Sequence, residues 1–506
     1  MRLSDLIRPL EDALLVNYGE RSIRGLSLDS RRVSHGHLFA VVSGPHCDGT
    51  RYVPDAIAHG ATAVLASRKV FVPSDVALIL VPNVRRALAE LCAHYYGRPA
   101  DFVRTVGVTG TNGKTTVAML VRCLLGAAGL QAALISTVVH QIGTRRLPSA
   151  NTTPESPDLQ AFFAEMVERH IRYAVMEVSS HSLDQHRVWG IPVEVAALTN
   201  VTSHEHLDYH ITFERYRLAK ARLFESLAPS ATAVLNADDP NCGFFADQCR
   251  HGRVMTYGLT GGTDVSATVE ATDLSGMTVR LSTPVGQQRV RSPLIGGYNL
   301  ENLLCGTCCG LALGLDLPAM AAGIERFTGA PGRLERIDEG QPFTVLVDYA
   351  HNNGGLQSVL TTLRPLAEPG RLIVVFGAGG DRDPSKRPLM GATASELADR
   401  VVLTADNSRS ERSEDIIAAI ASGTDGGGAD VVVEADRREA IRLAVDAAAP
   451  GDVVLIAGKG HENTQEIEGI RHPFDDRDVA RRALGGLAQR RAKRAGRGAL
   501  SASGIT

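Results

Sequence analysis

The chain has 506 residues, and at about 150 residues per domain this length predicts roughly three domains. Lys and Arg number 53 against 56 Asp and Glu, and 44% of residues are hydrophobic, a globular composition that excludes a disordered chain. Because the charges are balanced, the chain lacks the overall positive charge that non-specific nucleic-acid binding requires. No apolar run reaches the ~18 residues of a membrane span. Eight cysteines are too few for a disulfide framework, so we expect a protein of the reducing cytoplasm.

The first two blocks of the chain differ in the spacing of their apolar runs. Residues 1–100 carry the short runs LFAVV, ATAVLAS and VALILVP, followed by a helical pattern over 84–96, which predicts a small α/β domain. Over residues 101–330, fully apolar strands alternate with longer helices, one beginning at 114 and one over 159–169. This alternation predicts a P-loop ATPase-like parallel sheet with helices on both faces.

The later part of the chain contains a second alternation of strands and helices. Gly and Thr crowd residues 258–283, where a few antiparallel strands are expected before helices at 299–313 and 318–327. Residues 331–488 carry five apolar strand patterns separated by helices, which predicts a Rossmann-like, doubly wound domain. The tail 489–506 is basic and aperiodic; we expect disorder there, with a functional basic arm as the alternative.

The segment VGVTGTNGKTT, residues 106–116, joins an apolar strand to a helix. A Gly-rich loop in this context presents backbone N–H groups to phosphates, while Lys114 neutralises them and Thr115 is suited to bind Mg²⁺. The loop departs from the usual spacing because Val108 stands where the first Gly is expected. ATP use is the inference, with a phosphate-binding set of Gly110, Thr111, Asn112, Gly113, Lys114, Thr115 and Thr116.

This loop variant, TGTNGKTT, resembles that of the Mur ligase superfamily, ATP-dependent amide ligases that extend the peptide of a cell-wall precursor. The block LDSRRVSHGHLFAVVSG near residue 28 is similar to the uridine-nucleotide end of the branch that adds the third amino acid. Further motifs follow in the family's order: NTTP, MEVSSHSLDQHRV, TNVTSHEHLDYH, FERYRLAKARLF, GYNLENLL, PGRLE, DYAHNN, GAGGDRDPSKRPLM, DNSRSE and GKGHE. The resemblance implies a UDP-sugar-binding domain over 1–100, an ATP-binding domain over 101–330 and an amino-acid-binding domain over 331–488.

Amide synthesis from a carboxylate requires an activated acyl group, which phosphorylation by ATP supplies. Two anions must then meet, so catalysis requires positioning and charge neutralisation by cations and metal. Glu177 ends an apolar strand, where open α/β sheets place their site residues, and with Thr115 it is the candidate for a first Mg²⁺. The alternative for Glu177 is a solvated loop acid.

The cluster HEHLDYH contains three histidines, at positions 204, 206 and 210. A zinc site is one interpretation, but the spacing lacks the helical H-E-x-x-H layout, and the carboxylates Glu205 and Asp208 beside a phosphate loop favour Mg²⁺. By resemblance, His206 heads a metal- or nucleotide-orienting motif in which Glu205 replaces the family's Asp. An ordinary fold-stabilising role for His206 and Asp208 remains the alternative.

Lys220 lies in the helical segment FERYRLAKARLF, where an exposed, solvated ammonium is the plain expectation. In the resembled family the matching lysine is carbamylated by CO₂, which turns a cation into a carboxylate that binds a second Mg²⁺. The resemblance therefore implies a catalytic set of Lys114, Glu177, His206 and carbamylated Lys220, with Mg²⁺ held by Thr115, Glu177, His206 and Lys220.

The resemblance also assigns three groups of binding residues. The nucleotide-sugar peptide is expected to contact Ser30, Asn151, Thr152, Thr153, Ser179, Gln185 and Arg187. The adenine and phosphate side of ATP is expected to contact Asn299, Arg333, Asp348 and His351, although PGR could be a plain turn. The incoming amino acid is expected to contact Arg387, Asp406, Asn407, Arg409, Gly458 and Glu462.

The incoming amino acid is expected to be meso-diaminopimelate, because diaminopimelate-adding members carry DNPR and the segment here keeps Asn407 and Arg409. Ser408 and Asn353 stand where proline is usual, which leaves open a related ligase of a specialised peptide pathway. A P-loop ATPase switch and a non-catalytic ATP carrier are the alternatives from other classes. We expect a monomer that acts on UDP-MurNAc-dipeptide and an amino acid, without nucleic acid.

Overall fold

A computed structural model describes residues 1–487 except 18, 45–47, 150 and 203–206. The sequence predictions for His204, Glu205, His206 and the tail 489–506 therefore lie outside the described residues. The chain is mixed α/β with several sheets, as predicted. It forms two compact units, the first made of Met1–Thr268, Leu281–Gln288 and Glu301–Ile324 and the second of the other described residues. None of the helices in the described residues is long and apolar enough to cross a membrane.

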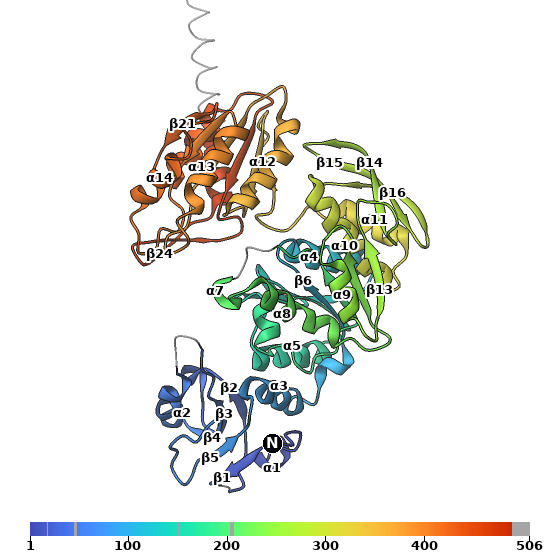
Figure 1. Ribbon diagram of the computed structural model, residues 1–506, viewed down its shortest axis with the longest axis vertical. Helices are drawn as coiled ribbons and strands as arrows, with labels where there is room; N and C mark the ends of the chain where they lie inside the picture. Colours follow the sequence, from blue (N-terminus) through green and yellow to red (C-terminus); the bar gives the residue numbers. More distant parts are fainter. Residues whose placement is uncertain (18, 45–47, 150, 203–206, 488–506) are drawn as a thin grey trace, which may run out of the picture. The chain divides into compact units, whose positions relative to one another are not determined.

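A five-stranded sheet forms the N-terminal part of the first unit (Figure 1). Its elements are α1 Leu3–Leu6, β1 Leu14–Val16, β2 Gly25–Ser27, β3 His37–Ala40, α2 Val53–Ala58, β4 Ala61–Ala66, β5 Ala77–Leu80 and α3 Val84–Tyr95. The order is β1-β5-β4-β3-β2, with β2 to β5 parallel and β1 antiparallel at the edge. The three apolar runs form β3, β4 and β5, so their carboxyl ends share one edge of the sheet.

An eight-stranded sheet forms the rest of the first unit, in the order β13-β12-β11-β6-β10-β7-β8-β9. Its strands are β6 Arg104–Thr109, β7 Ala132–Ile135, β8 Val139–Ile142, β9 Arg145–Pro148, β10 Tyr173–Glu177, β11 Val195–Leu198, β12 Thr232–Asn236 and β13 Arg253–Tyr257. Its helices are α4 Lys114–Ala127, α5 Ser156–Glu168, α6 Ser180–Asp184, α7 Leu207–His210, α8 Phe213–Glu225 and α9 Cys242–Gln248.

The central sheet differs from the purely parallel prediction at one edge, where β8 is antiparallel to both of its neighbours, β7 and β9. The short β8–β9 connection at Gly143 makes a hairpin, and a tight hairpin can only join antiparallel strands. Strand β6 lies between β10 and β11 with parallel pairing on both sides. The segments that follow Thr109, Glu177 and Leu198 therefore begin at the same edge of the sheet.

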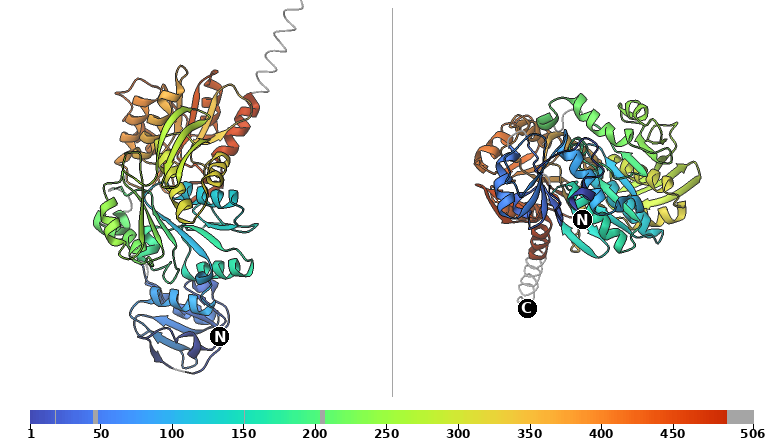
Figure 2. Two further views of the ribbon diagram at one scale, coloured as in Figure 1. Left: turned by 90° about the vertical axis from the view of Figure 1, so that its right-hand side faces the viewer. Right: turned by 90° about the horizontal axis from the view of Figure 1, so that it is seen from below.

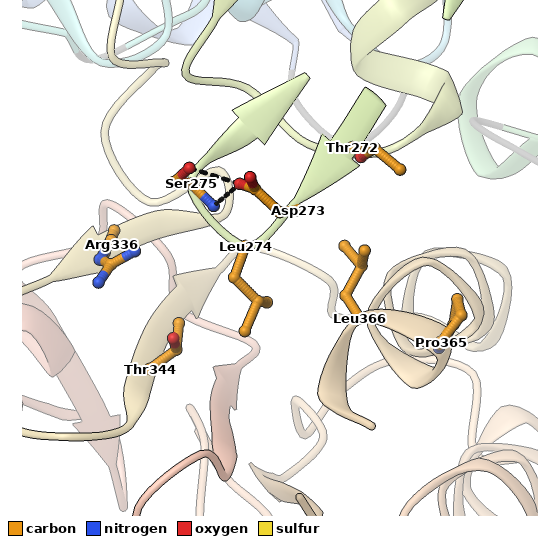
Figure 3. A pocket seen from close by; sticks show the side chains of 8 residues that line it. All are labelled: Thr272, Asp273, Leu274, Ser275, Arg336, Thr344, Pro365 and Leu366. Atoms are coloured by element: carbon orange, nitrogen blue, oxygen red, sulfur yellow. Dashed lines mark hydrogen bonds between the residues drawn. The ribbon is translucent and has the colours of Figure 1, made fainter. Parts of the chain in front are cut away.

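The Gly- and Thr-rich stretch forms the predicted antiparallel strands, β14 Ser266–Asp273, β15 Gly276–Thr283 and β16 Gly286–Ser292. The helices α10 Gly297–Ala312 and α11 Leu317–Arg326 follow, close to the predicted ranges. Leu274, at the β14–β15 turn, packs against the core of the second unit. Beside this turn is an open hollow of about 520 Å³ (Figure 3), lined by Thr272, Asp273, Leu274, Ser275, Arg336, Thr344, Pro365 and Leu366.

A six-stranded sheet forms the second unit, in the order β17-β18-β22-β19-β20-β21. Its strands are β17 Glu335–Ile337, β18 Thr344–Asp348, β19 Leu372–Phe376, β20 Arg400–Leu403, β21 Asp430–Val433 and β22 Val453–Ala457, and a small hairpin adds β23 Thr464–Ile467 and β24 Ile470–Pro473. All five predicted strands are present and parallel, and β17 adds an antiparallel edge.

Helices cover both faces of this second sheet (Figure 2). One face packs against α12 Asn353–Ala367, α13 Lys386–Leu397 and α14 Ser413–Ala421. The opposite face packs against α15 Arg437–Ala447 and the helical residues 476–487. Strands buried on both faces must be apolar throughout, which explains the continuous Val, Leu and Ile runs of the sequence.

Candidate active site

The phosphate-loop segment lies between β6 and the N-terminus of α4, as the sequence predicts. The Lys114 Nζ donates to the backbone carbonyls of Gly110 and Thr111, at 3.0 and 2.8 Å, so its ammonium lies over the loop. The loop is fixed from the neighbouring strand end, where the Asn200 carbonyl accepts from the Thr111 N–H at 2.7 Å. Backbone amides and a lysine at a helix N-terminus form a site for polyphosphate.

Gly110 is required by the close approach of the next strand end. Its φ is +147°, and a Cβ at this position would lie 1.8 Å from the Thr199 Oγ1. That hydroxyl in turn donates to the Asn112 carbonyl at 2.5 Å. The loop and the end of β11 are therefore packed too closely for any side chain at this glycine.

Lys220 is buried, in contrast to the solvated ammonium that its helix alone would predict. Only 1% of the residue is exposed, and its Nζ donates to the Gly110 carbonyl at 2.8 Å, the same oxygen that receives Lys114. Burial lowers the pKa of Lys220 well below its ordinary value, and the Lys114 charge lowers it further. Two lysine side chains of the first unit thus meet at one carbonyl of the phosphate loop.

Glu177 ends β10 and is fully buried, so it is not a solvated loop acid. Its carboxylate accepts from the Thr137 N–H at 2.8 Å and from the Thr137 hydroxyl at 3.0 Å. The Thr137 hydroxyl also lies 3.1 Å from the Thr152 Oγ1, and the Thr153 hydroxyl donates to the Glu177 carbonyl at 2.9 Å. The NTTP segment thus contacts the backbone of Glu177 directly and its carboxylate through the Thr137 hydroxyl.

The nucleotide-sugar residues that follow Glu177 also come together. Ser179 caps α6 through the Ser182 N–H, and its own N–H donates to the Thr153 hydroxyl at 3.1 Å. Arg187 donates to the Thr153 carbonyl at 2.9 Å and to the Gln185 Oε1 at 2.8 Å. Asn151 is exposed. Ser30 is buried in the N-terminal sheet, at the start of a short 3-10 turn that connects β2 to β3.

A carboxylate that the sequence analysis missed connects this group to the N-terminal sheet. Glu155 forms ion pairs with Arg187 at 3.1 Å and with Arg85 at 3.0 Å. Arg85 lines a hollow of about 230 Å³ at the carboxyl ends of β3, β4 and β5, together with Val41, Val42, Ser43, Thr50, Ala66, Ser67, Arg68, Pro82, Asn83 and Val84. In open parallel sheets, ligands bind at this edge of the strands.

The described part of the HEHLDYH cluster places Asp208 and His210 in α7. The His210 ring nitrogen Nε2 lies 2.9 Å from the Ser180 hydroxyl, and burial lowers the pKa of His210 to about 4. Asp208 is exposed. Among the described residues no group of three His, Cys, Asp or Glu side chains is arranged to hold a metal. The zinc interpretation itself is not tested, because His204, Glu205 and His206 lie outside these residues.

The predicted nucleotide residues of the second unit differ in burial: Asp348 and Asn299 are buried, Arg333 is half-buried and His351 is exposed. Asp348 ends β18 and accepts from the Leu334 and Ala350 N–H groups at 2.7 and 2.8 Å, while burial raises the pKa of its carboxyl. Asn299 is buried and donates to the Ile295 carbonyl at 2.9 Å. The Arg333 guanidinium stacks on the Tyr349 ring at 4.5 Å, and His351 is exposed with its Nδ1 2.8 Å from the Tyr349 carbonyl.

Two arginines of the predicted amino-acid site converge on the loop at Gly379 and Gly380. Arg387 is buried, pairs with Glu411 at 2.8 Å and contacts the Gly379 carbonyl at 3.5 Å. The Arg409 guanidinium donates to the Gly380 carbonyl. Arg409 also has a left-handed φ of +53°, which hydrogen bonds to the β23–β24 hairpin hold in place.

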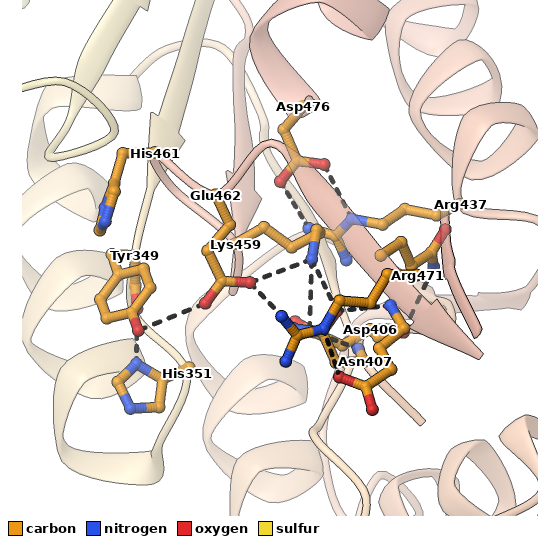
Figure 4. Close-up of polar contacts among 12 residues, drawn as sticks. Tyr349, His351, Asp406, Asn407, Arg437, Lys459, His461, Glu462, Arg471 and Asp476 are labelled. Atoms are coloured by element: carbon orange, nitrogen blue, oxygen red, sulfur yellow. Dashed lines mark hydrogen bonds and ion pairs between the residues drawn. The ribbon is translucent and has the colours of Figure 1, made fainter. Parts of the chain in front are cut away.

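The other predicted amino-acid residues form one polar network (Figure 4). The Asn407 amide donates to the Glu462 carboxylate at 2.8 Å. Gly458, with a φ of +119°, lies so close to Asp406 that a Cβ would be 2.4 Å from the carboxylate oxygen. The sequence analysis missed Lys459, a fully buried cation in the middle of this network. The sequence feature that could have revealed it is a lysine between two glycines immediately after an apolar strand pattern.

Comparison with known proteins agrees with these features. Three family models match: Mur ligase family, catalytic domain, at residues 22–96; Mur ligase middle domain at 108–310; and Mur ligase, glutamate ligase domain, at 332–460. The chain is 43% identical over 490 residues to UDP-N-acetylmuramoyl-L-alanyl-D-glutamate–2,6-diaminopimelate ligase of Geobacillus kaustophilus (strain HTA426), covering 96% of this chain and 99% of that protein.

Solved structures give the same result at the level of the fold. A structure of a UDP-N-acetylmuramoyl-L-alanyl-D-glutamate–2,6-diaminopimelate ligase superposes with a TM-score of 0.69 at 35% identity, covering 92% of this chain and 95% of that one. The MurF ligase of Thermotoga maritima, solved in complex with ADP, shares the fold with a TM-score of 0.62 at 20% identity, covering 92% and 98%. The chain belongs to the Mur ligase family.

Proposed function

We propose that the protein is an ATP-dependent amide ligase that adds a diamino acid, meso-diaminopimelate, to UDP-MurNAc-L-Ala-D-Glu in the synthesis of a peptidoglycan precursor. The observation that carries this proposal is the buried Lys220 amine on the Gly110 carbonyl of the phosphate loop. A P-loop ATPase switch requires only the one phosphate-loop lysine that Lys114 supplies. A ligase must also neutralise charge where ATP and a carboxylate meet, and a carbamylated Lys220 would supply a carboxylate that holds a second Mg²⁺ there.

The reaction proceeds in two balanced steps. A carboxylate oxygen of the D-glutamyl residue attacks the γ-phosphorus of ATP, ADP leaves, and an acyl phosphate forms. The amine of the incoming amino acid then attacks the acyl carbon, phosphate leaves, and the amine loses a proton. Lys114 neutralises the phosphates during the first step, and the Thr152 and Thr153 segment holds the substrate beside Glu177.

The donor set of the first unit fits Mg²⁺ better than a soft metal. Glu177 and Thr115 offer buried oxygen ligands of the kind that Mg²⁺ prefers. The described residues contain no group of three His, Cys, Asp or Glu side chains that could enclose the ion, so its remaining ligands would be phosphate oxygens and water. We propose that Thr115, Glu177 and carbamylated Lys220 hold the ions, with His206 as the further ligand of the resemblance. When bound, Mg²⁺ supplies neutralisation of the negative charge that builds up between ATP and the carboxylate.

The hollow at the N-terminal sheet suits the nucleotide end of the sugar substrate. Arg68 and Arg85 supply cations at its rim, and the N-terminus of α3 faces the same edge at Val84. From there the Arg85–Glu155–Arg187 ion pairs lead to Thr153 and Glu177. We infer that the uridine diphosphate binds in the hollow and that the peptide extends along these residues toward the phosphate loop.

The specificity part of the proposal rests on Arg409. Ser408 stands where proline is usual, but two hydrogen bonds still hold the loop backbone in place. The Arg409 N–H donates to the Glu466 carbonyl, and the Arg409 carbonyl accepts from the Gly469 N–H, both at 3.1 Å. The guanidinium is thereby held beside Arg387 at the Gly379–Gly380 loop. A planar carboxylate at the far end of a diamino acid is suited to such a pair.

Phosphate release with a panel of diamino acids tests this assignment. We expect the native enzyme to prefer meso-diaminopimelate over L-lysine in kcat/KM, and Arg409→Ala to lower kcat/KM for meso-diaminopimelate about 100-fold. Arg412 is an exposed arginine three residues further on, so Arg412→Ala is the matched control and should leave kcat/KM for meso-diaminopimelate unchanged. A higher kcat/KM for L-lysine than for meso-diaminopimelate, or an unaltered kcat/KM for meso-diaminopimelate in Arg409→Ala, would contradict the assignment.

A further inference from the structure

Lys459 is a buried cation without an assigned role, placed between the residues proposed to bind the incoming amino acid. It follows β22, and none of its surface is exposed. Its Nζ lies 3.0 Å from the Asn407 Oδ1, 3.1 Å from the Glu462 Oε2 and 4.0 Å from the Asp406 Oδ1. All three partners belong to the predicted amino-acid site, and two of them come from a segment more than 50 residues away.

The contacts of Lys459 determine which way the Asn407 amide points. The Asn407 Oδ1 accepts from Lys459 at 3.0 Å and from the Glu466 N–H at 2.9 Å. Two donors on one oxygen leave the NH₂ group on the other side, where it donates to the Glu462 Oε2 at 2.8 Å. A flipped amide would place its NH₂ against an ammonium and a second N–H, so the observed orientation is the only satisfied one.

The same ammonium also orients the Glu462 carboxylate. The Oε2 receives both Lys459 and Asn407, while the Oε1 has a long contact of 3.4 Å with the Tyr349 hydroxyl. Glu462 is about one-third exposed in its side chain, unlike Lys459 beneath it. The oxygen that is less engaged is therefore available to receive a donor from a bound ligand.

The charges beneath the site favour a cationic ligand. Arg437 and Asp476 form a fully buried ion pair at 2.7 Å, and Asp406 lies between Arg437 and Lys459. Burial raises the pKa of Asp406, but these two cations outweigh burial and leave its pKa below the ordinary value. Within these five side chains the carboxylates outnumber the cations by one, and the exposed member is Glu462.

We propose that Lys459 is a positioning residue of the amino-acid site, whose buried ammonium fixes the Asn407 amide and the Glu462 carboxylate in the orientation that receives the amino group of the incoming diamino acid. The proposal rests on the ligase function proposed above. Lys459 acts through its two partners, so its removal disturbs the binding of the amino acid while the nucleotide sites stay intact. A cation that served only the stability of the fold would affect all substrates alike.

The test compares Lys459→Met, which keeps the length of the side chain and removes its charge, with Arg471→Met, which removes an exposed cation paired with Glu466. For Lys459→Met we expect the KM of the diamino acid to rise about tenfold or more, with the KM values of ATP and nucleotide sugar within about twofold. Arg471→Met should match the native enzyme. An unchanged diamino-acid KM, or an equal rise in all three KM values, would overturn the proposal.

A crystal structure of the variant separates this proposal from the proposed function. In Lys459→Met we expect the Asn407 amide or the Glu462 carboxylate to take a new orientation, and an unchanged Asn407–Glu462 pair would overturn the positioning role even if the native enzyme used no diamino acid. The ligase function itself is judged on the native enzyme alone, by its turnover of the panel. Should Lys459→Met fail to fold, Lys459→Gln, shorter and uncharged, takes its place in both measurements.

Discussion

Lys220→Ala is expected to lower kcat at least about 1,000-fold, because it removes the lysine whose proposed carbamate holds Mg²⁺ at the phosphate loop, where two anions must meet. Three features of Lys220 support the proposed carbamylation: it is buried, it shares the Gly110 carbonyl with Lys114, and burial lowers its pKa well below the ordinary value. An uncharged amine is the form that reacts with CO₂. The loss is measured by phosphate release, with circular dichroism to show that the fold is retained.

Arg215→Ala is the matched control, because Arg215 is exposed on the same helix, α8. It should leave kcat unchanged. Acetate should partly restore Lys220→Ala by supplying the missing carboxylate, and ¹³CO₂ should give a carbamate NMR signal in the native enzyme that the variant lacks. Near-normal turnover of Lys220→Ala would refute the catalytic role; absence of both rescue and carbamate signal would refute the modification.

Gly110→Ala is expected to reduce ATP turnover by at least about 100-fold, since a displacement of the loop by about 1 Å already costs that much. The added methyl group would lie 1.8 Å from the Thr199 Oγ1 and 3.1 Å from the backbone N and O of Asn200. A φ of +147° adds strain for any L-residue other than glycine. The loop must therefore move away from β11, which also lowers the melting temperature.

Gly126→Ala is the control for this change, because Gly126 lies in α4 and a Cβ there meets no atom within 4 Å. Alanine in a helix is more favourable than glycine by up to about 1 kcal/mol, so the control should be slightly more stable. Turnover and melting temperature of the two variants are compared under the same conditions. If Gly110→Ala retained native ATP turnover, the close packing of the loop would have no part in catalysis.

Local sequence patterns were sufficient for the parallel strands and their helices, and for the residues at the ends of these strands. The strand–loop–helix spacing placed Gly110 and Lys114 in the phosphate loop, and an apolar strand ending in an acid placed Glu177 in the buried site. Both signals depend on neighbours within a few residues. The antiparallel hairpin β8–β9 has no comparable apolar run, because its second strand is largely exposed at the edge of the sheet.

Contacts between distant segments could not be read in this way. Helical spacing leaves Lys220 on an exposed face until the packing of α8 against the phosphate loop is known. Glu155 looks like a solvated acid until Arg85 and Arg187 meet it from opposite sides. Lys459 gains its partners only where β20 and β22 end at the same edge of the second sheet. Such groupings follow from topology, which the sequence pattern specifies only in part.

An isotope-labelling experiment that follows an oxygen atom from the substrate to phosphate tests whether an acyl phosphate forms. UDP-MurNAc-L-Ala-D-Glu with ¹⁸O in the D-glutamyl carboxylates is incubated with ATP, Mg²⁺ and meso-diaminopimelate, and the released phosphate is analysed by mass spectrometry. An acyl-phosphate ligase must transfer one carboxylate oxygen to each phosphate, so we predict singly labelled phosphate together with the tripeptide product. Unlabelled phosphate, or phosphate release that does not require the carboxylate substrate, would contradict the account.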